Sequence, residues 1–313
     1  MHNQTITIRE LTAPNDIARF WEELYAYDQR DLFPDFDEED RAYFMSQEYR
    51  SAIEALHSRE TDPLHYLFFQ QDGRDIGFTS IVGYLSEDGK FFILEFCVFP
   101  KFRGNGTGRA CAAALLDWGR QRGAVYFELS ANTERRQRFW KSVGFLPNGV
   151  DEWGMPLLLL PPEERLPFTV EILENPEDKD LGWQLQKLEN SFLAEIGEEA
   201  LDDEKKTRLA RAVREQRITF FLARRGYRVV GMCSVSPCFS TFACTETGVF
   251  DDFFVEPVFR QQGAARLLAG AAQDWCRKQG FASLTVGCSA GDVGMYRALG
   301  FETELGTMLA CGL

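Results

Sequence analysis

The stretch "FRGNGTGRA", Phe102–Ala110, places three glycines and two arginines where a helix is expected to begin. The stretch "FRQQGAARL", Phe259–Leu267, repeats this arrangement with fewer glycines. The first turn of a helix leaves backbone N–H groups unpaired, and the helix dipole makes that end positive. Glycine permits a tight bend and close approach of an anion, and arginine adds a forked cationic donor. Both stretches therefore predict the capture of an anion, such as a phosphate, at a helix N-terminus.

Two common phosphate loops do not fit these stretches. A Walker loop requires a lysine after its last glycine, and no lysine follows either turn. A dinucleotide fingerprint, G-x-G-x-x-G, would require glycine where Arg109 stands. The missing lysine argues against an enzyme that uses nucleoside triphosphates.

Matching residues recur in order along the chain, which predicts an internal duplication. Arg103 and Arg260 lie 157 residues apart, and the same interval separates five further pairs. These pairs are Gly106 and Gly263, Val98 and Val255, Pro100 and Pro257, Trp118 and Trp275, and Arg120 and Arg277. Upstream, Leu11, Pro14, Asp16 and Trp21 match Leu173, Pro176, Asp178 and Trp183 at an interval of 162. The shift between intervals is what insertions in loops between fixed elements produce.

A proline-rich charged segment follows the apolar run "MPLLLL" and separates the two copies. We expect a first domain over residues 1–160, a linker over 161–167 and a second domain over 168–313. A chain of 313 residues is long enough for two such domains.

Composition narrows the class of protein. The eight cysteines and three histidines show no metal-ligand spacing, which favours buried thiols in a reducing cytoplasm over disulfides or zinc. The net charge of −14 argues against nucleic acid as a partner and suits a cationic substrate or simple solvation. No apolar run is long enough for a signal peptide or a membrane span, so we expect no membrane partner.

Each copy predicts the same order of elements. A short strand and an amphipathic helix come first, followed by a charged helical region and a hairpin that turns at Asp72-Gly73 or Arg225-Gly226. A long apolar strand then leads into the glycine turn and a helix that stops at Gly123 or Gly280. One more strand and helix complete the copy. This order predicts an α+β fold with a mainly antiparallel sheet and one βαβ crossover.

The pattern R-x-x-G-x-[GA], preceded by V-x-P and followed by a closing aromatic-x-x-x-G-F, resembles the GCN5-related N-acetyltransferase (GNAT) family. The resemblance covers both copies almost whole and implies that the chain transfers an acetyl group from acetyl-CoA to an amine. It implies a central splayed strand in each domain, and turn amides that hold the pyrophosphate of acetyl-CoA. The cofactor-binding residues implied are Val98, Arg103, Gly104, Asn105, Gly106, Thr107, Gly108, Val255, Arg260, Gln261, Gln262, Gly263, Ala264 and Ala265.

The resemblance also implies catalytic roles. The backbone N–H of Val255, or of Val98 in the first copy, would meet the thioester carbonyl. Tyr296, in "MYRALGF", fills the position of a proton donor, whereas the first copy has Trp140, whose indole N–H is not an acid near neutral pH. Asp252, or Glu95 in the first copy, is a candidate base, although positions three apart on a regular strand point to opposite faces unless a bulge intervenes. Tyr296 favours the second domain as the catalytic one.

Several alternatives remain open from the sequence. "RGNGTG" is closer to the family pattern than "RQQGAA", so the first domain could hold the cofactor better and be the catalytic one. A non-catalytic acyl-CoA-binding or scaffold protein is a further reading. The acidic stretches 35–40 and 198–206 lie where the family places its acceptor site, and either attract a cationic amine or are exposed helix faces. Asn132 matches a polar position near the cofactor, and Ser289 replaces it in the second copy. The acceptor itself, a small molecule or a peptide, is not identified by the sequence.

Overall fold

The computed structural model describes residues 5–151, 153–178 and 181–306 and divides the chain into two compact units. The first unit comprises residues 1–146 and 157–163, and the second comprises residues 147–156 and 164–313. Residues 147–156 thus group with the second unit, a detail that the sequence does not predict. The mixed α and β architecture in two copies is confirmed.

A seven-stranded sheet, built mainly from the first unit, has the strand order β1-β2-β3-β4-β5-β7-β6. These strands are β1 (Thr7–Glu10), β2 (Leu64–Gln71), β3 (Arg74–Tyr84), β4 (Lys90–Val98), β5 (Tyr126–Ser130), β6 (Leu146–Val150) and β7 (Pro156–Leu160). Only β4 and β5 pair in parallel among the pairings that the described residues define. This is the single crossover that the sequence predicts, made through the helix that follows the glycine turn.

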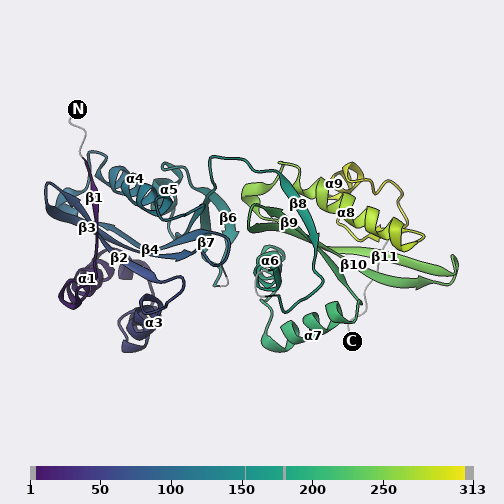
Figure 1. Cartoon of the computed structure of the whole chain (residues 1–313), viewed down its shortest axis with the longest axis horizontal. Coiled ribbons are helices and arrows are strands. Elements are labelled where there is room, and N and C mark those ends of the chain that lie inside the picture. Colours follow the sequence, from purple (N-terminus) through teal and green to yellow (C-terminus); the bar gives the residue numbers. More distant parts are fainter. Residues whose placement is uncertain (1–4, 152, 179–180, 307–313) are drawn as a thin grey trace. The chain divides into compact units, whose positions relative to one another are not determined.

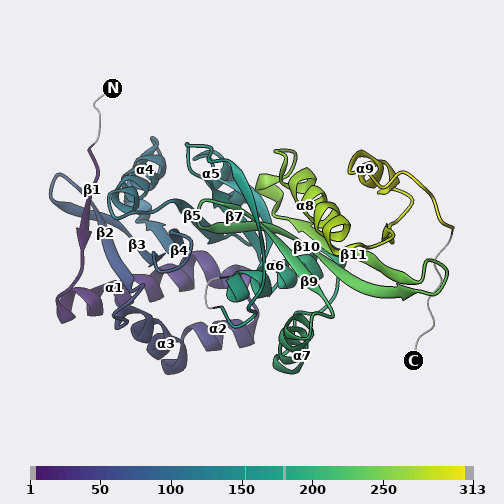
Figure 2. The same ribbon diagram turned by 45° about the vertical axis from the view of Figure 1, so that its right-hand side comes forward.

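Helices cover both faces of the first sheet (Figure 1). The helical elements are α1 (Pro14–Tyr27), the π-helical turn η1 (Asp28–Leu32), η2 (Phe33–Asp35), α2 (Glu38–Phe44), α3 (Gln47–His57), η3 (Pro100–Phe102), α4 (Thr107–Arg120) and α5 (Glu134–Lys141). Helices α4 and α5 lie on one face and α1 and α3 on the other, and the two cores are separated by the sheet (Figure 2). Alternating side chains of β4 serve the two cores, with Val98 on the α4 side and Cys97 on the α1 side.

The second unit repeats this plan with the strand order β12-β11-β10-β9-β8. Its elements are β8 (Phe168–Ile172), α6 (Leu181–Ile196), α7 (Asp203–Arg214), β9 (Thr219–Arg225), β10 (Arg228–Ser240), β11 (Thr245–Val255), η4 (Pro257–Phe259), α8 (Ala264–Gln279), β12 (Leu284–Val286) and α9 (Val293–Ala298). Helices α6 and α7 lie on one face and α8 on the other (Figure 1). Among the described residues of either unit, no helix combines the length and apolarity needed to cross a membrane.

Candidate functional site

The glycine turn of the first unit links the end of β4 to the start of α4. Gly104, Asn105 and Gly106 have φ angles of 95°, 49° and 83°, so three successive residues are left-handed. Asn105 is a residue type that tolerates this conformation better than most, and glycine adopts it at little cost. Turns of this kind gather successive N–H groups into a concave site for an anion.

The amides of this turn are available for a ligand. In the described chain, no hydrogen bond is donated by the amides of Gly104, Asn105, Gly106, Gly108 and Arg109, whereas Thr107 N donates to Gly104 O at 3.0 Å. A Cβ atom added at Gly104 or Gly106 would meet nothing within 4 Å, so the space beside the backbone is open. Residues 104–106 are exposed, and a phosphate fits this donor set.

The second turn is similar but less regular. Gln261 and Gly263 are left-handed, with φ angles of 59° and 104°. Gln262 is held in place because its side chain accepts from Arg225 at 2.8 Å and donates to Val258 O at 2.7 Å. The remaining sequence-predicted residues of this turn are Ala264 and Ala265, at the start of α8. None of the amides of residues 261–265 donates a hydrogen bond within the described chain.

The two turn arginines bind protein groups. Arg103 Nε donates to Val98 O at 2.7 Å, and its terminal nitrogens pair with Asp31. Arg260 repeats this arrangement, with Nε on Val255 O at 2.8 Å and Nη2 on Glu195 at 2.6 Å. The hydrogen bond from Arg103 is the main reason that the pKa of Asp31 falls to about 2. The arginines therefore fix the bend after the central strand, and the amides are left to contact an anion.

The central strand of each unit separates from its parallel neighbour. Pairing of β4 with β5 covers only residues 90–92, and pairing of β11 with β12 covers only residues 248–250. A bulge also interrupts each antiparallel pairing, between Ser80 and Ile81 of β3 and between Met232 and Ser234 of β10. The second half of the central strand therefore has an open edge, as the splayed strand of the resemblance implies.

Strand register places the amides of Val98 and Val255 on this open edge. Phe99 N donates to Ile76 O at 2.9 Å, and Glu256 N donates to Val230 O at 2.8 Å. In an antiparallel pair, alternate residues point their N–H groups to opposite sides. Val98 and Val255 therefore point away from β3 and β10, toward the gap. Neither residue falls within the described pairings to β5 or β12, and neither amide donates to a described residue outside the strands.

Glycines stand opposite both valines, a signal that sequence reasoning missed. Gly77 pairs with Val98, and Gly231 pairs with Val255. A Cβ at Gly77 would lie 2.2 Å from Cys97 O, and one at Gly231 would lie 2.9 Å from Phe254 O. These close approaches exclude a side chain. The dipeptides "IG" and "VG" in the two hairpins were the available signal.

Asp252 lies in the bulge of β11. Its φ is 49°, and its carboxylate accepts a hydrogen bond from Ser234 at 2.6 Å. Burial raises the pKa of this carboxyl, and Ser234 opposes the shift. Glu95 differs, because regular pairing runs from Glu95 to Val98 and places them on opposite faces of the sheet. The carboxyl of Glu95 lies on the face that α1 and α3 cover.

Tyr296 packs against β11 from α9. Its ring centroid lies 6.0 Å from that of Phe253 and 6.4 Å from that of Phe250. Burial raises the pKa of the phenol to about 12, so the hydroxyl keeps its proton near neutral pH. Its hydroxyl has no hydrogen-bond partner among the described residues. Trp140, at the same position of the first unit, is buried among Phe96, Phe139 and Phe145.

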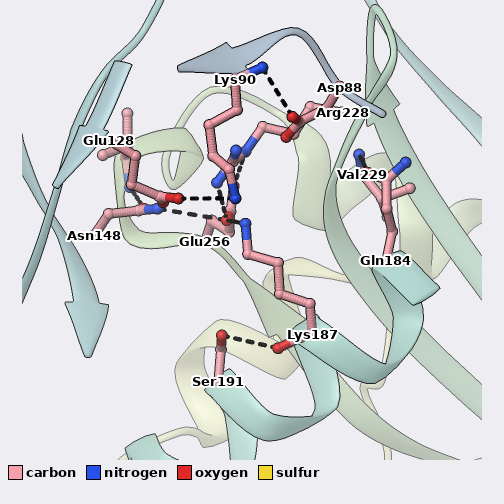
Figure 3. Close-up of polar contacts among 11 residues, drawn as sticks. Asp88, Lys90, Glu128, Asn148, Gln184, Lys187, Ser191, Arg228, Val229 and Glu256 are labelled. Carbon is pink, nitrogen blue, oxygen red and sulfur yellow. Dashed lines mark hydrogen bonds and ion pairs between the residues drawn. The ribbon is translucent and has the colours of Figure 1, made fainter. Parts of the chain in front are cut away.

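A buried ion pair holds the strand end that carries Val255. Glu256, the next residue, accepts from Arg228 Nε at 2.8 Å and from Nη2 at 2.6 Å (Figure 3). Lys187 of α6 lies 3.8 Å from the same carboxylate, and Gln184 of α6 accepts from Val229 N at 2.6 Å. These contacts fix α6, β10 and the end of β11 to one another.

The acidic stretches supply helix caps. Asp37 accepts from Asp40 N at 2.8 Å at the start of α2, and Asp202 accepts from Lys205 N at 2.7 Å at the start of α7. Two further polar positions are engaged within their own unit. Asn132 accepts a hydrogen bond from Arg136, and Ser289 donates one to Asp292 at 2.6 Å.

Sequence comparison agrees with this duplicated geometry. A family model described as "Acetyltransferase (GNAT) family" matches residues 21–145 and 183–301, one match per unit. The two matches include both glycine turns and both open strand edges. No curated protein sequence matches the chain.

Solved structures of acetyltransferases are similar to part of the chain. Glucosamine-6-phosphate N-acetyltransferase from Arabidopsis thaliana is 16% identical, with a TM-score of 0.38, over 46% of this chain and 98% of that chain. An aminoglycoside acetyltransferase from an uncultured soil metagenomic sample, in complex with sisomicin, is 16% identical, with a TM-score of 0.42. The match covers 47% of this chain and 95% of that chain. A predicted acetyltransferase with acetyl-CoA from Clostridium acetobutylicum is 12% identical, with a TM-score of 0.40. The match covers 46% of this chain and 96% of that chain.

Proposed function

The chain is an acetyltransferase of the GNAT family, and from this premise we propose that its second unit transfers an acetyl group from acetyl-CoA to a primary amine of a small molecule or peptide. The observation that carries the proposal is the N–H of Val255, which faces the gap between β11 and β12 beside a turn with free amides. When bound, acetyl-CoA supplies a thioester carbonyl.

The turn over residues 261–265 binds the diphosphate in this proposal. Its amides and the dipole of α8 favour negative charge at this end of the helix. Arg260 acts as a positioning residue, because its bonds to Val255 O and Glu195 hold the bend that aims the amides. Gln262 contributes its backbone N–H, since its side chain is already engaged.

Three groups then serve the transfer. Asp252 takes a proton from the ammonium, and the neutral amine nitrogen forms a bond to the thioester carbon. The N–H of Val255 donates to the negative charge that develops on the carbonyl oxygen. As the carbon–sulfur bond breaks, the Tyr296 hydroxyl gives its proton to the sulfur and regains one from the attacking nitrogen. The products are the amide and the free thiol.

The first unit is a second candidate for the transferring unit. Its turn has three successive left-handed residues and glycine at position 108, so it offers the more regular anion site. Val98 presents its N–H as Val255 does. The buried indole of Trp140 cannot replace the phenol as a proton donor, which favours the second unit.

The test is amine-dependent release of free thiol from acetyl-CoA across a panel of primary amines, amino acids and peptides. A blank without amine is required, because Cys238, Cys244 and Cys288 are exposed and react with the same thiol reagent. We expect Tyr296→Phe to lower kcat by about a hundredfold and to leave acetyl-CoA affinity unchanged. Tyr227→Phe is the matched control, because this tyrosine of the second unit is 72% exposed.

Two outcomes contradict this assignment. If Tyr296→Phe keeps the wild-type kcat, Tyr296 is not the proton donor. The first unit then becomes the favoured site of transfer. No thiol release with any amine of the panel, despite acetyl-CoA binding, contradicts transfer to amines of these classes.

A further inference from the structure

A cleft of about 600 Å³ lies in the first unit, away from the glycine turn. Its lining comes from the segment before β2, the end of β3, the start of β4 and Arg122, two residues beyond α4. The strand register pairs Leu64 with Val82 and Gly83 with Phe91, so these strand ends meet at one end of the sheet. The glycine turn stands at the other end of α4, whose 14 residues span roughly 21 Å. The cleft is therefore separate from the anion site of this unit.

Two basic side chains that line the cleft share the same two supports. Arg122 Nη2 donates to Glu10 Oε2 at 3.2 Å, and its guanidinium carbon lies 4.0 Å from the ring centroid of Trp118. His65 Nδ1 lies 2.6 Å from Glu10 Oε1, and its ring centroid lies 5.2 Å from that of Trp118. A guanidinium has several N–H donors, so the bond to Glu10 leaves others for the carboxylate of a ligand.

The segment before β2 brings negative charge to the same cleft. Glu60 is exposed, and Asp62 is fixed because Ser86 donates to it from its backbone N–H at 3.1 Å and from its hydroxyl. A carboxylate accepts about four hydrogen bonds, so Asp62 keeps acceptor capacity for a ligand ammonium. The lining of one cleft therefore carries both signs of charge.

Apolar groups complete the lining. Phe91 is 1% exposed, whereas Leu85 is 53% exposed and Pro63 is partly buried. A Cβ atom at Gly83 would lie 2.7 Å from the Phe91 ring, so the absence of a side chain at this position lets the ring pack against β3. A mainly apolar lining with a few polar groups, in a cleft of this volume, is typical of a site for a small molecule.

We propose that this cleft binds a small zwitterion with an apolar body, of the amino-acid class, whose carboxylate contacts Arg122 and whose ammonium contacts Glu60 and Asp62. A ligand with a single charge would leave the lining of the other sign without a partner, so charge-assisted hydrogen bonds at both ends favour the zwitterion. The site does not depend on acetyl transfer.

The duplication supplies the substitution that tests the site. Trp118 recurs as Trp275 at the interval of 157, but the same interval places Gln279 opposite Arg122. Gln279 is the last residue of α8, so glutamine is compatible with this end of the helix. Arg122→Gln therefore removes the charge and keeps a residue that the fold accepts in its other copy.

The experiment titrates the full chain with phenylalanine and ε-aminocaproate by isothermal calorimetry and ligand-detected NMR. Phenylpropionate and phenethylamine are the controls that carry one charge only. We expect saturable binding of at least one zwitterion, with both controls at least about tenfold weaker. Arg122→Gln should weaken the zwitterion at least about tenfold, and Glu60→Gln about threefold, because Asp62 remains. Arg120→Gln is the matched control, because Arg120 and Arg122 have side chains that are 45% and 40% exposed.

Charge selectivity adds a readout that a purely structural role of Arg122 would not produce. In Arg122→Gln the carboxylate loses its partner, so the zwitterion and phenethylamine should bind with similar affinity. Thermal unfolding of each variant shows that it is folded. Wild-type zwitterion affinity in Arg122→Gln, or no saturable binding of either zwitterion, overturns the proposal. Absence of thiol release with intact zwitterion binding contradicts only the proposed function.

Discussion

At the scale of single residues, the left-handed conformation of Gly106 is the most specific feature of the first turn. Alanine at φ 83° is strained by about 1–2 kcal/mol, although no atom blocks its Cβ. Gly106→Ala should therefore lower the unfolding free energy by about this amount and weaken acetyl-CoA binding at the first unit about tenfold, because relief of the strain turns the amides away. Calorimetric titration measures the affinity. Gly73→Ala, at φ 74° in the β2–β3 turn, should lose the same stability with no loss of affinity.

Single-residue reasoning from the sequence succeeds where the chemistry is local. Glycine at positions 104 and 106 predicts a tight, open turn because no other residue adopts left-handed angles so cheaply. The partners of Arg103 could not be predicted, since Asp31 lies 72 residues earlier in the chain. The same holds for the buried carboxyls of Asp28 and Glu189, because residues distant in sequence cover them. The roles of Tyr296, Val255 and Asp252 stay predictions.

At the scale of elements, the Arg228–Glu256 pair ties β10 to the end of β11. The two side chains are 1% and 5% exposed. Removing the charge of one partner weakens a buried pair and its two hydrogen bonds, so Glu256→Gln should lower the unfolding free energy by about 3 kcal/mol in urea titrations. Asp274→Asn breaks an exposed pair with Arg277 and should change stability by less than about 0.5 kcal/mol. Equal effects of the two substitutions would show that the pair does not anchor the strand.

Most elements could be predicted because the spacing of apolar residues and the residue types at the turns indicate the same boundaries. The hairpin at Asp72-Gly73 and the stop of α8 at Gly280, which has a φ of 79°, follow directly from their residues. The π-helical turn η1 and the bulge at Asp252 could not be predicted, since both insert a residue for reasons that lie in neighbouring elements. The predicted turn at Arg225-Gly226 lies one residue early, because β9 includes Arg225.

At the scale of the whole molecule, the duplication is confirmed, and the described parts of the two copies differ at one sheet edge. The seven-stranded sheet continues beyond β5 with β7 and β6, whereas the described part of the five-stranded sheet ends at β12. Phe145 of the closing motif is accordingly 1% exposed, whereas its counterpart Phe301 is only partly buried. Matching intervals in the sequence reveal which elements recur, and they do not reveal how many strands cover each edge. Tyr296 thus lies in the copy whose described sheet edge is less covered.

Two buried carboxyls, of Asp28 in η1 and Glu189 in α6, also set how stability of the whole chain varies with pH. The pKa values of Asp28 and Glu189 rise from their ordinary values of 3.8 and 4.5 to about 7 and about 8. Between these limits the folded chain binds more protons than the unfolded chain, so the unfolding free energy falls as pH rises. Asp31 acts in the opposite direction, but only below its ordinary pKa of 3.8. We therefore expect a higher urea midpoint at about pH 6 than at about pH 8, measured at about 0.5 M salt to screen the net charge of −14. The Asp28→Asn/Glu189→Gln double variant should flatten this slope and Glu22→Gln, at an exposed carboxylate of α1, should keep it, whereas an unchanged slope in the double variant would assign the pH dependence to other groups.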